Sequence, residues 1–188
     1  MNSKILTLSG ALLLSASVPA LADDGHFDGF YAGGEAGYNE VKYKNEDLDF
    51  DIDADGLNYG GFAGFRQQTS SGLVVGLEGH YKDSEASIGD DDASLDFDRQ
   101  VGVDALIGTT VGTAEQVLLF AFAGYENARL TASFLDEEES TDLDGVRVGG
   151  GAEFALSDNM SLRTTVAYTD YEEDVSNIEG TAGFVLDF

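Results

Sequence analysis

Apolar and polar residues alternate with a period of two through eight segments of this chain. Successive side chains of a β-strand point to opposite faces, so the alternation predicts eight strands that each have one apolar face. The apolar faces begin at Phe30, Leu57, Leu73, Val101, Val117, Val146, Leu162 and Ile178. The fifth segment is apolar on both faces, and we orient it with Val117 and Tyr125 outward because Tyr125 then lies level with the other tyrosines.

The connections between these segments alternate in length. Short connections are expected at residues 67–72, 112–116 and 157–160, and long ones at 43–56, 83–96, 129–142 and 170–176. An even number of antiparallel strands, with short turns on one side and long loops on the other, is typical of an outer-membrane barrel. We therefore predict an all-β fold, an eight-stranded antiparallel up-and-down transmembrane β-barrel.

Aromatic residues on the apolar faces are sorted by their position along the strands. The tyrosines fall at the long-loop end, namely Tyr38, Tyr59, Tyr81, Tyr125 and Tyr168. Phenylalanines fall at the short-turn end, namely Phe30, Phe65, Phe154 and Phe188. A tyrosine ring is stable at the level of lipid headgroups because its hydroxyl stays hydrated there. These residues are predicted to form the two aromatic girdles of a membrane barrel.

The N-terminus and the composition narrow the location. Lys4, an apolar run from Ile5 to Val18 and the tripeptide Ala20-Leu21-Ala22 form the pattern of a secretory signal peptide. We expect residues 1–22 to be cleaved and residues 23–188 to form the barrel domain. A net charge of -27 argues against nucleic-acid binding, which needs a basic surface, and the chain has no cysteine for disulfides.

Two short stretches resemble a known family. Residues 28–38, DGFYAGGEAGY, resemble the opening strand of the small OmpA-type and opacity-type outer-membrane barrels. Residues 183–188, GFVLDF, resemble the C-terminal signal that these proteins present to the barrel assembly machinery. The resemblance implies a β-barrel in the outer membrane of a Gram-negative bacterium, in contact with lipid and lipopolysaccharide. It implies no single function, because the family ranges from adhesion to envelope integrity.

Charged residues collect on the inward face of the predicted strands. They are Glu35, Arg66, Glu78, His80, Lys82, Asp104, Arg147, Glu153 and Arg163. An eight-stranded barrel is only wide enough to be filled by its own side chains, so these groups are expected to pair. Glu153 and Arg163 flank one short turn on the same face, which predicts a salt bridge. Three carboxylates, Glu35, Glu78 and Asp104, lie at mid-depth, where they repel one another unless arginine or lysine side chains reach them.

The stretch DLDFDIDADG, residues 47–56, places five aspartates at alternate positions. Asp51, Asp53, Asp55 and Gly56 match the start of a calcium loop, but the twelfth position is Phe62 instead of the required glutamate. A complete calcium site is therefore not expected, although these aspartates can hold divalent cations loosely. The alternation of the second segment, extended past Tyr59, places these aspartates on the outer face of a strand and not in a calcium loop.

The same extension in neighbouring segments turns the outer face polar and the inner face apolar. The inward apolar positions include Val41, Tyr43, Phe50, Ile52, Ile88, Ala128, Leu130, Phe134 and Tyr171. This inversion is expected where strands leave lipid, since water then lies outside. It predicts strands extended beyond the membrane on the extracellular side and closed over an apolar cap.

A filled and capped barrel favours a structural or surface-interaction role for a monomer, through envelope integrity or loop-mediated adhesion. A low-conductance porin-like channel is the alternative, and it requires a continuous water path past the inward charges. A lipid-modifying enzyme is a third possibility. However, His80 points inward and His26 precedes the first strand, where we expect it in solvent. We therefore predict neither a catalytic residue nor a cofactor.

Overall fold

A computed structural model describes residues 25–45, 50–90, 93–112, 116–134, 137–172 and 175–188. Within these ranges, the side chains at 43–54, 86–98 and 132–139 are not described. The expected signal peptide at 1–22 therefore lies outside the described residues. None of the described segments forms a helix with the length and hydropathy needed to cross a membrane.

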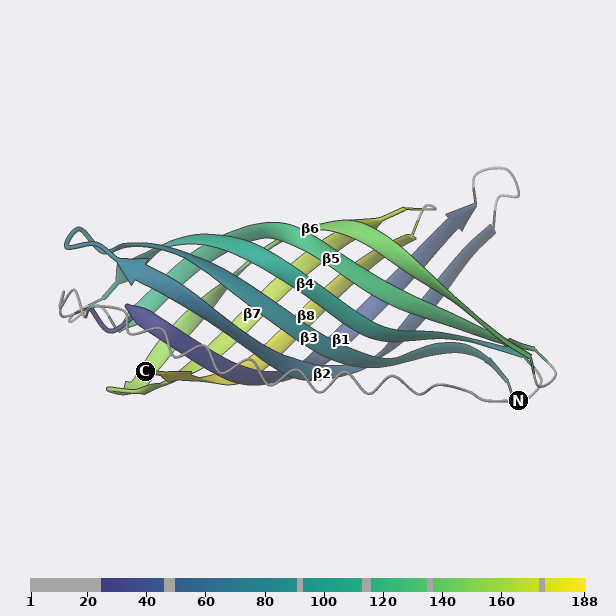
Figure 1. Ribbon diagram of the computed structural model, residues 1–188, viewed down its shortest axis with the longest axis horizontal. Coiled ribbons are helices and arrows are strands. Elements are labelled where there is room, and N and C mark those ends of the chain that lie inside the picture. The colour runs from purple at the N-terminus through teal and green to yellow at the C-terminus, as the bar shows by residue number, and fades with distance from the viewer. Residues whose placement is uncertain (1–24, 46–49, 91–92, 113–115, 135–136, 173–174) are drawn as a thin grey trace, which may run out of the picture.

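Eight antiparallel strands form one closed barrel (Figure 1). They are β1 (Gly29–Asn45), β2 (Phe50–Gln68), β3 (Leu73–Asp90), β4 (Ala93–Val111), β5 (Val117–Phe134), β6 (Glu137–Ser157), β7 (Met160–Tyr171) and β8 (Val175–Asp187). Each strand pairs with the next, and β8 closes the barrel on β1. The predicted fold and the three short connections are confirmed, and the C-terminus lies at the end that carries those short turns.

The strands are staggered around the barrel. A path that follows paired residues once around the barrel begins on β1 at Phe30 and returns to β1 at Glu40. On the way it passes through Phe65, Leu77, Ala105, Ala123, Val148, Tyr168 and Ile178. A displacement of ten residues, from position 30 to position 40, over eight strands corresponds to a strand tilt of roughly 40°. This tilt lies within the range of transmembrane barrels.

The outer wall is apolar between two aromatic levels. The five predicted tyrosines all point outward, with exposed fractions between 42% and 52%. The tyrosines lie at similar heights along the barrel. Tyr38 pairs with Leu57, which is two residues from Tyr59, and Tyr59 pairs with Asp83, which is two residues from Tyr81. At the other end the outward phenylalanines include Phe30 and Phe65, which pair directly and whose rings lie 5.0 Å apart.

Two apolar clusters fill opposite ends of the interior. The turn-side cluster consists of Phe27, Tyr31, Phe62, Val74, Leu106, Leu118, Phe120, Phe122, Ala167 and Val185. The loop-side cluster consists of Val41, Ala128, Leu143, Tyr171 and Val175, with Leu130 packed against it. The loop-side cluster confirms the predicted inward direction of Val41, Ala128, Leu130 and Tyr171. The other inward positions named above, at residues 43, 50, 52, 88 and 134, lie outside the described side chains.

Residues before β1 fold back under the turn-side mouth of the barrel. Phe27 is fully buried, and its backbone N–H donates to Gln68 Oε1 at 3.1 Å. This position corrects our expectation that His26 lies free in solvent. The His26 ring is partly buried, packs edge-on against Phe27, and places Nε2 3.4 Å from Ser161 Oγ. Burial of the adjacent Phe27 draws the histidine against the barrel.

Candidate functional site: the charged lumen

The inward charges form two networks inside the barrel. We call Arg66, Glu78, Glu153, Arg163 and Asp187 the turn-side network, and His80, Lys82, Asp104, Glu126, Arg147 and Glu179 the loop-side network. Strand alternation brings every one of these side chains to the inner face. Most partners come from strands that are not neighbours, so strand stagger sets their pairing, whereas Glu153 and Arg163 lie opposite each other on β6 and β7.

Glu153 is the centre of the turn-side network. Arg66 donates two parallel hydrogen bonds to its carboxylate, each 3.0 Å long, and Arg163 Nε donates a third at 2.9 Å. The salt bridge predicted between Glu153 and Arg163 is therefore present. Arg163 also pairs with Glu78, whose carboxylate accepts the Tyr31 hydroxyl at 2.7 Å. Arg66 in turn reaches Asp187 on β8.

Aromatic rings line the turn-side arginines. The Arg163 guanidinium lies 4.4 Å from the ring centre of Phe62 and 5.1 Å from that of Tyr31. Arg66 lies 4.5 Å from the Tyr31 ring and 5.0 Å from the Phe27 ring. A guanidinium over the negative face of an aromatic ring is attracted to it, so rings supply part of the stabilisation that water would give.

Arg147 is the centre of the loop-side network. Its guanidinium pairs with Asp104 and Glu179, and its Nε lies 3.5 Å from Glu126. Lys82 also pairs with Glu179, which in addition accepts the Asn58 side-chain amide at 2.9 Å. Glu126 further accepts the hydroxyl of Tyr171, a member of the loop-side cluster. The charged network and the apolar cluster above it are thus joined by a hydrogen bond.

His80 lies between two carboxylates of the loop-side network. Its Nε2 is 2.9 Å from Glu126 Oε2, and its Nδ1 is 3.4 Å from Asp104 Oδ2. Gly102 makes room for the ring, because a Cβ at that position would lie 2.5 Å from His80 Nε2. Both ring nitrogens therefore face negative charge in the interior.

The three carboxylates predicted to cluster at mid-depth are separated by their partners. Glu78 and Asp104 are paired residues of β3 and β4, yet Glu78 turns to Arg163 and Asp104 to Arg147. Glu35 belongs to neither network and accepts the Thr181 hydroxyl at 2.7 Å. Arginine side chains cross the lumen to reach Glu78 and Asp104, which avoids an uncompensated buried cluster.

Sequence reasoning missed Glu126, Glu179 and Asp187. The alternation of the fifth and eighth segments places all three on the inner face, so the signal was present in the pattern. Loose binding of divalent cations at Asp51, Asp53 and Asp55 is not tested, because the first two side chains lie outside those described. Asp55 is exposed and accepts the Tyr38 hydroxyl. Among the described side chains, no group of three or more metal-ligating residues is arranged to hold an ion.

The comparison with protein families identifies the barrel. Residues 8–188 match the family described as "Outer membrane protein beta-barrel domain". The chain belongs to this family. This outer-membrane protein is 30% identical over 151 residues to a 22 kDa outer membrane protein of Rhizobium leguminosarum bv. viciae, a match that spans 79% of this chain and 66% of the relative. It is 26% identical to a 31 kDa outer-membrane immunogenic protein of Brucella melitensis biotype 1, over 83% of this chain and 76% of the relative.

Solved structures agree with this family at the level of the fold. The barrel superposes on Neisserial surface protein A with a TM-score of 0.60 and 17% identity, covering 86% of this chain and 98% of the neighbour. It superposes on Ail, the attachment invasion locus protein of Yersinia pestis, with a TM-score of 0.56 and 17% identity, covering 86% and 99%. The protein is therefore a small β-barrel of the bacterial outer membrane, related in fold to Ail and Neisserial surface protein A.

Proposed function

We propose that this barrel has a structural or surface-interaction role, in envelope integrity or loop-mediated adhesion, and that it conducts no ions. The observation that carries the proposal is the filling of the lumen. Two charge networks and two apolar clusters occupy it together, and Arg66, Lys82, Glu126 and Glu153 are completely buried. A porin-like channel needs a hydrated path, whereas these groups take one another as partners.

The connections and the polarity of the strands support the proposed orientation. The short turns lie in the periplasm, and the strands extend past the tyrosines on the extracellular side, where exposed Asp55, Glu85 and Asp170 face the lipopolysaccharide layer. Residues 1–22 act as the signal peptide, and 23–188 form the barrel domain. The C-terminal strand engages the barrel assembly machinery, and the folded protein is a monomer.

We propose no enzymatic activity. His80 is held between carboxylates inside the lumen, and the His26 ring places Nε2 against Ser161, which is completely buried. Neither histidine lies on the outer wall, where a lipid substrate would approach. A lipid profile that changes when His80 is replaced by alanine in the producing cell would contradict this assignment.

Planar-bilayer recording tests the non-conducting role. Purified wild-type barrel, with insertion verified by its heat-dependent gel migration, is expected to give no steady current. The matched control is the double variant Tyr171→Ala and Arg147→Ala, which removes the largest side chain of the loop-side cluster and the centre of the network below it. This variant should show small openings. Steady ohmic openings of the wild-type protein would overturn the proposal.

A further inference from the structure

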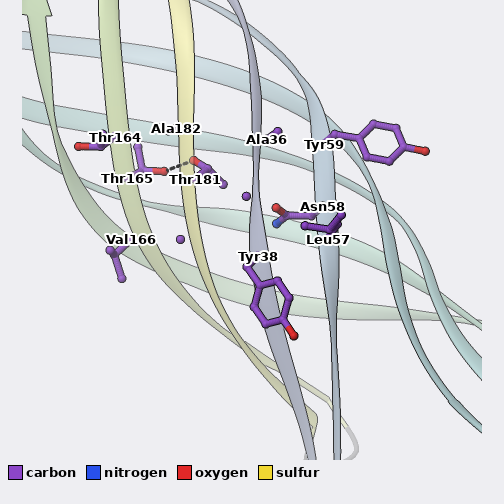
Figure 2. Close-up of a pocket in the computed structure, with 12 residues that line it drawn as sticks. Ala36, Tyr38, Leu57, Asn58, Tyr59, Thr164, Thr165, Val166, Thr181 and Ala182 are labelled. Atoms are coloured by element: carbon purple, nitrogen blue, oxygen red, sulfur yellow. Dashed lines mark hydrogen bonds between the residues drawn. The ribbon is translucent and has the colours of Figure 1, made fainter.

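A groove of about 700 Å³ lies on the outer wall, across β7, β8, β1 and β2. Figure 2 shows Tyr38 and Tyr59 on one side of it and Val166 on the other. The outward side chains that border it are apolar or uncharged, including Leu57, Thr164 and the three just named. The groove lies inside the apolar band, directly below the level of the tyrosine hydroxyls.

The hollow arises because small residues from neighbouring strands coincide. Gly180 pairs with Tyr38 and with Val166, so a residue without a side chain stands between two large ones. In the next row, Ala182 pairs with Ala36 and with Thr164. A Cβ built at Gly180 would meet no atom within 4 Å, which places this glycine at open space.

We infer that this groove holds one acyl chain of an outer-leaflet membrane lipid. The groove is continuous with the lipid-facing wall, so hydrocarbon already surrounds it, and a gap beside packed side chains loses dispersion contacts unless a chain fills it. Its loop-side end opens at Tyr38, whose hydroxyl bonds to exposed Asp55. The lipid headgroup lies at that polar end, and the acyl chain runs along Gly180 and Ala182.

A second copy of this chain fits the groove less well. A two-fold dimer places the same patch of both subunits face to face. Two identical hollows brought together leave a void, whereas a flexible chain of methylene groups follows the groove floor. The assignment of this lipid to the outer leaflet rests on the proposed orientation of the barrel. Retention of a lipid in the groove does not depend on that orientation, so the orientation can be wrong while the groove still binds a lipid, and the reverse also holds.

The test compares the wild-type protein with two glycine substitutions. Gly180→Leu fills the groove from its floor. The matched control, Gly79→Leu, also points outward from the apolar band, on β3, where a Cβ would have ordinary contact at 3.8 Å from Gly102 O. Each protein is delipidated, refolded in detergent, incubated with lipopolysaccharide and measured by native mass spectrometry.

The wild-type protein and Gly79→Leu are expected to retain one lipid, and Gly180→Leu to retain at least five-fold less. Equal retention by all three proteins, or no retention by the wild type, would overturn the inference. A wild-type dimer that Gly180→Leu converts to a monomer would also overturn it, in favour of a second copy. Heat-dependent gel migration checks folding, and Ala182→Leu replaces Gly180→Leu if the latter does not fold.

Discussion

Glu153 on β6 accepts two parallel hydrogen bonds from Arg66 on β2, each 3.0 Å long, although the residues are 87 positions apart in the chain. The two strands are not neighbours in the barrel, so this contact crosses the lumen. Bidentate pairing of a guanidinium with a carboxylate is among the strongest polar contacts in proteins, and here it lies inside a narrow cylinder. The pair therefore links opposite walls of the barrel.

Removing Glu153 should destabilise the barrel strongly. Glu153→Leu removes the shared carboxylate and leaves Arg66 with Asp187 and Arg163 with Glu78 as their remaining acidic partners. Breaking a buried ion pair costs about 3–5 kcal/mol of unfolding free energy, and these remaining partners place the expected loss at the lower end of that range. Urea unfolding in phospholipid vesicles, followed by circular dichroism, measures the change. Glu172→Leu, which alters an exposed carboxylate beyond β7, is the control and should change little. Equal effects of the two substitutions would show that the network contributes no stability.

Adding one methyl group beside His80 should also destabilise the fold. Gly102→Ala places a Cβ 2.5 Å from His80 Nε2 and 2.6 Å from Tyr125 O, and the backbone atom cannot move aside easily. Overpacking of this kind costs about 1–3 kcal/mol. Gly79→Ala has room for the same methyl group and should be nearly neutral in the same urea titration. A neutral Gly102→Ala would show that the wall relaxes around His80.

Charge on the outer wall should be tolerated only outside the apolar band. Leu77 is 62% exposed and lies midway between Leu73 and Tyr81, so Leu77→Arg should lower stability in vesicles by about 2–4 kcal/mol. Gln67→Arg, exposed near the short turn after β2, is the matched control and should have a much smaller effect. Similar costs at the two positions would be inconsistent with the assigned position of the hydrocarbon band.

Asp142 should titrate below the ordinary range of an aspartate. The Arg129 guanidinium donates to its carboxylate at 3.0 and 3.2 Å on the polar part of the strands, and this hydrogen bond lowers the Asp142 pKa. A lowered folded-state pKa gives stability that is present above the pKa of the unfolded chain and is lost as pH falls through the folded value. The contribution is small because the pair is exposed and screened by salt.

Carbon-detected NMR of the Asp142 carboxylate measures this pKa directly. Arg129→Gln removes the charged donor and should raise the midpoint toward that of an unperturbed aspartate. High salt should move the wild-type midpoint in the same direction. An Asp142 midpoint that does not respond to Arg129→Gln would assign the shift to another group.

The fold was predictable because each strand separates two environments. Lipid outside and side chains inside impose strict alternation, so the outward direction of residues such as Tyr38 and Phe65 could be read from the pattern. The fifth segment is apolar on both faces, and it could be oriented because an outward Tyr125 lies at the same height as the other outward tyrosines. The inward direction of Val41 and Tyr171 followed from the same alternation, when it was continued past the point where the outer face turns polar.

The charge network was predictable only in part. Glu153 and Arg163 sit across one short turn, so their register follows from local sequence and their salt bridge could be anticipated. Glu126 and Glu179 lie on faces that the alternation identified, but their partners Lys82 and Arg147 do not lie across a short turn from them, so local sequence does not predict the pairing. His26 was misjudged because nothing in the local sequence indicates that the segment around Phe27 folds back into the barrel mouth.

Local alternation determined that this chain is a lipid-facing cylinder with charge inside, because the direction of a side chain depends only on its position in its own strand. Which charges meet was decided by the tertiary structure. Arg66 reaches Glu153 and Arg147 reaches Glu179 only because closure with a ten-residue stagger sets the relative height of strands that never pair. That height is a property of the closed barrel and of no single segment.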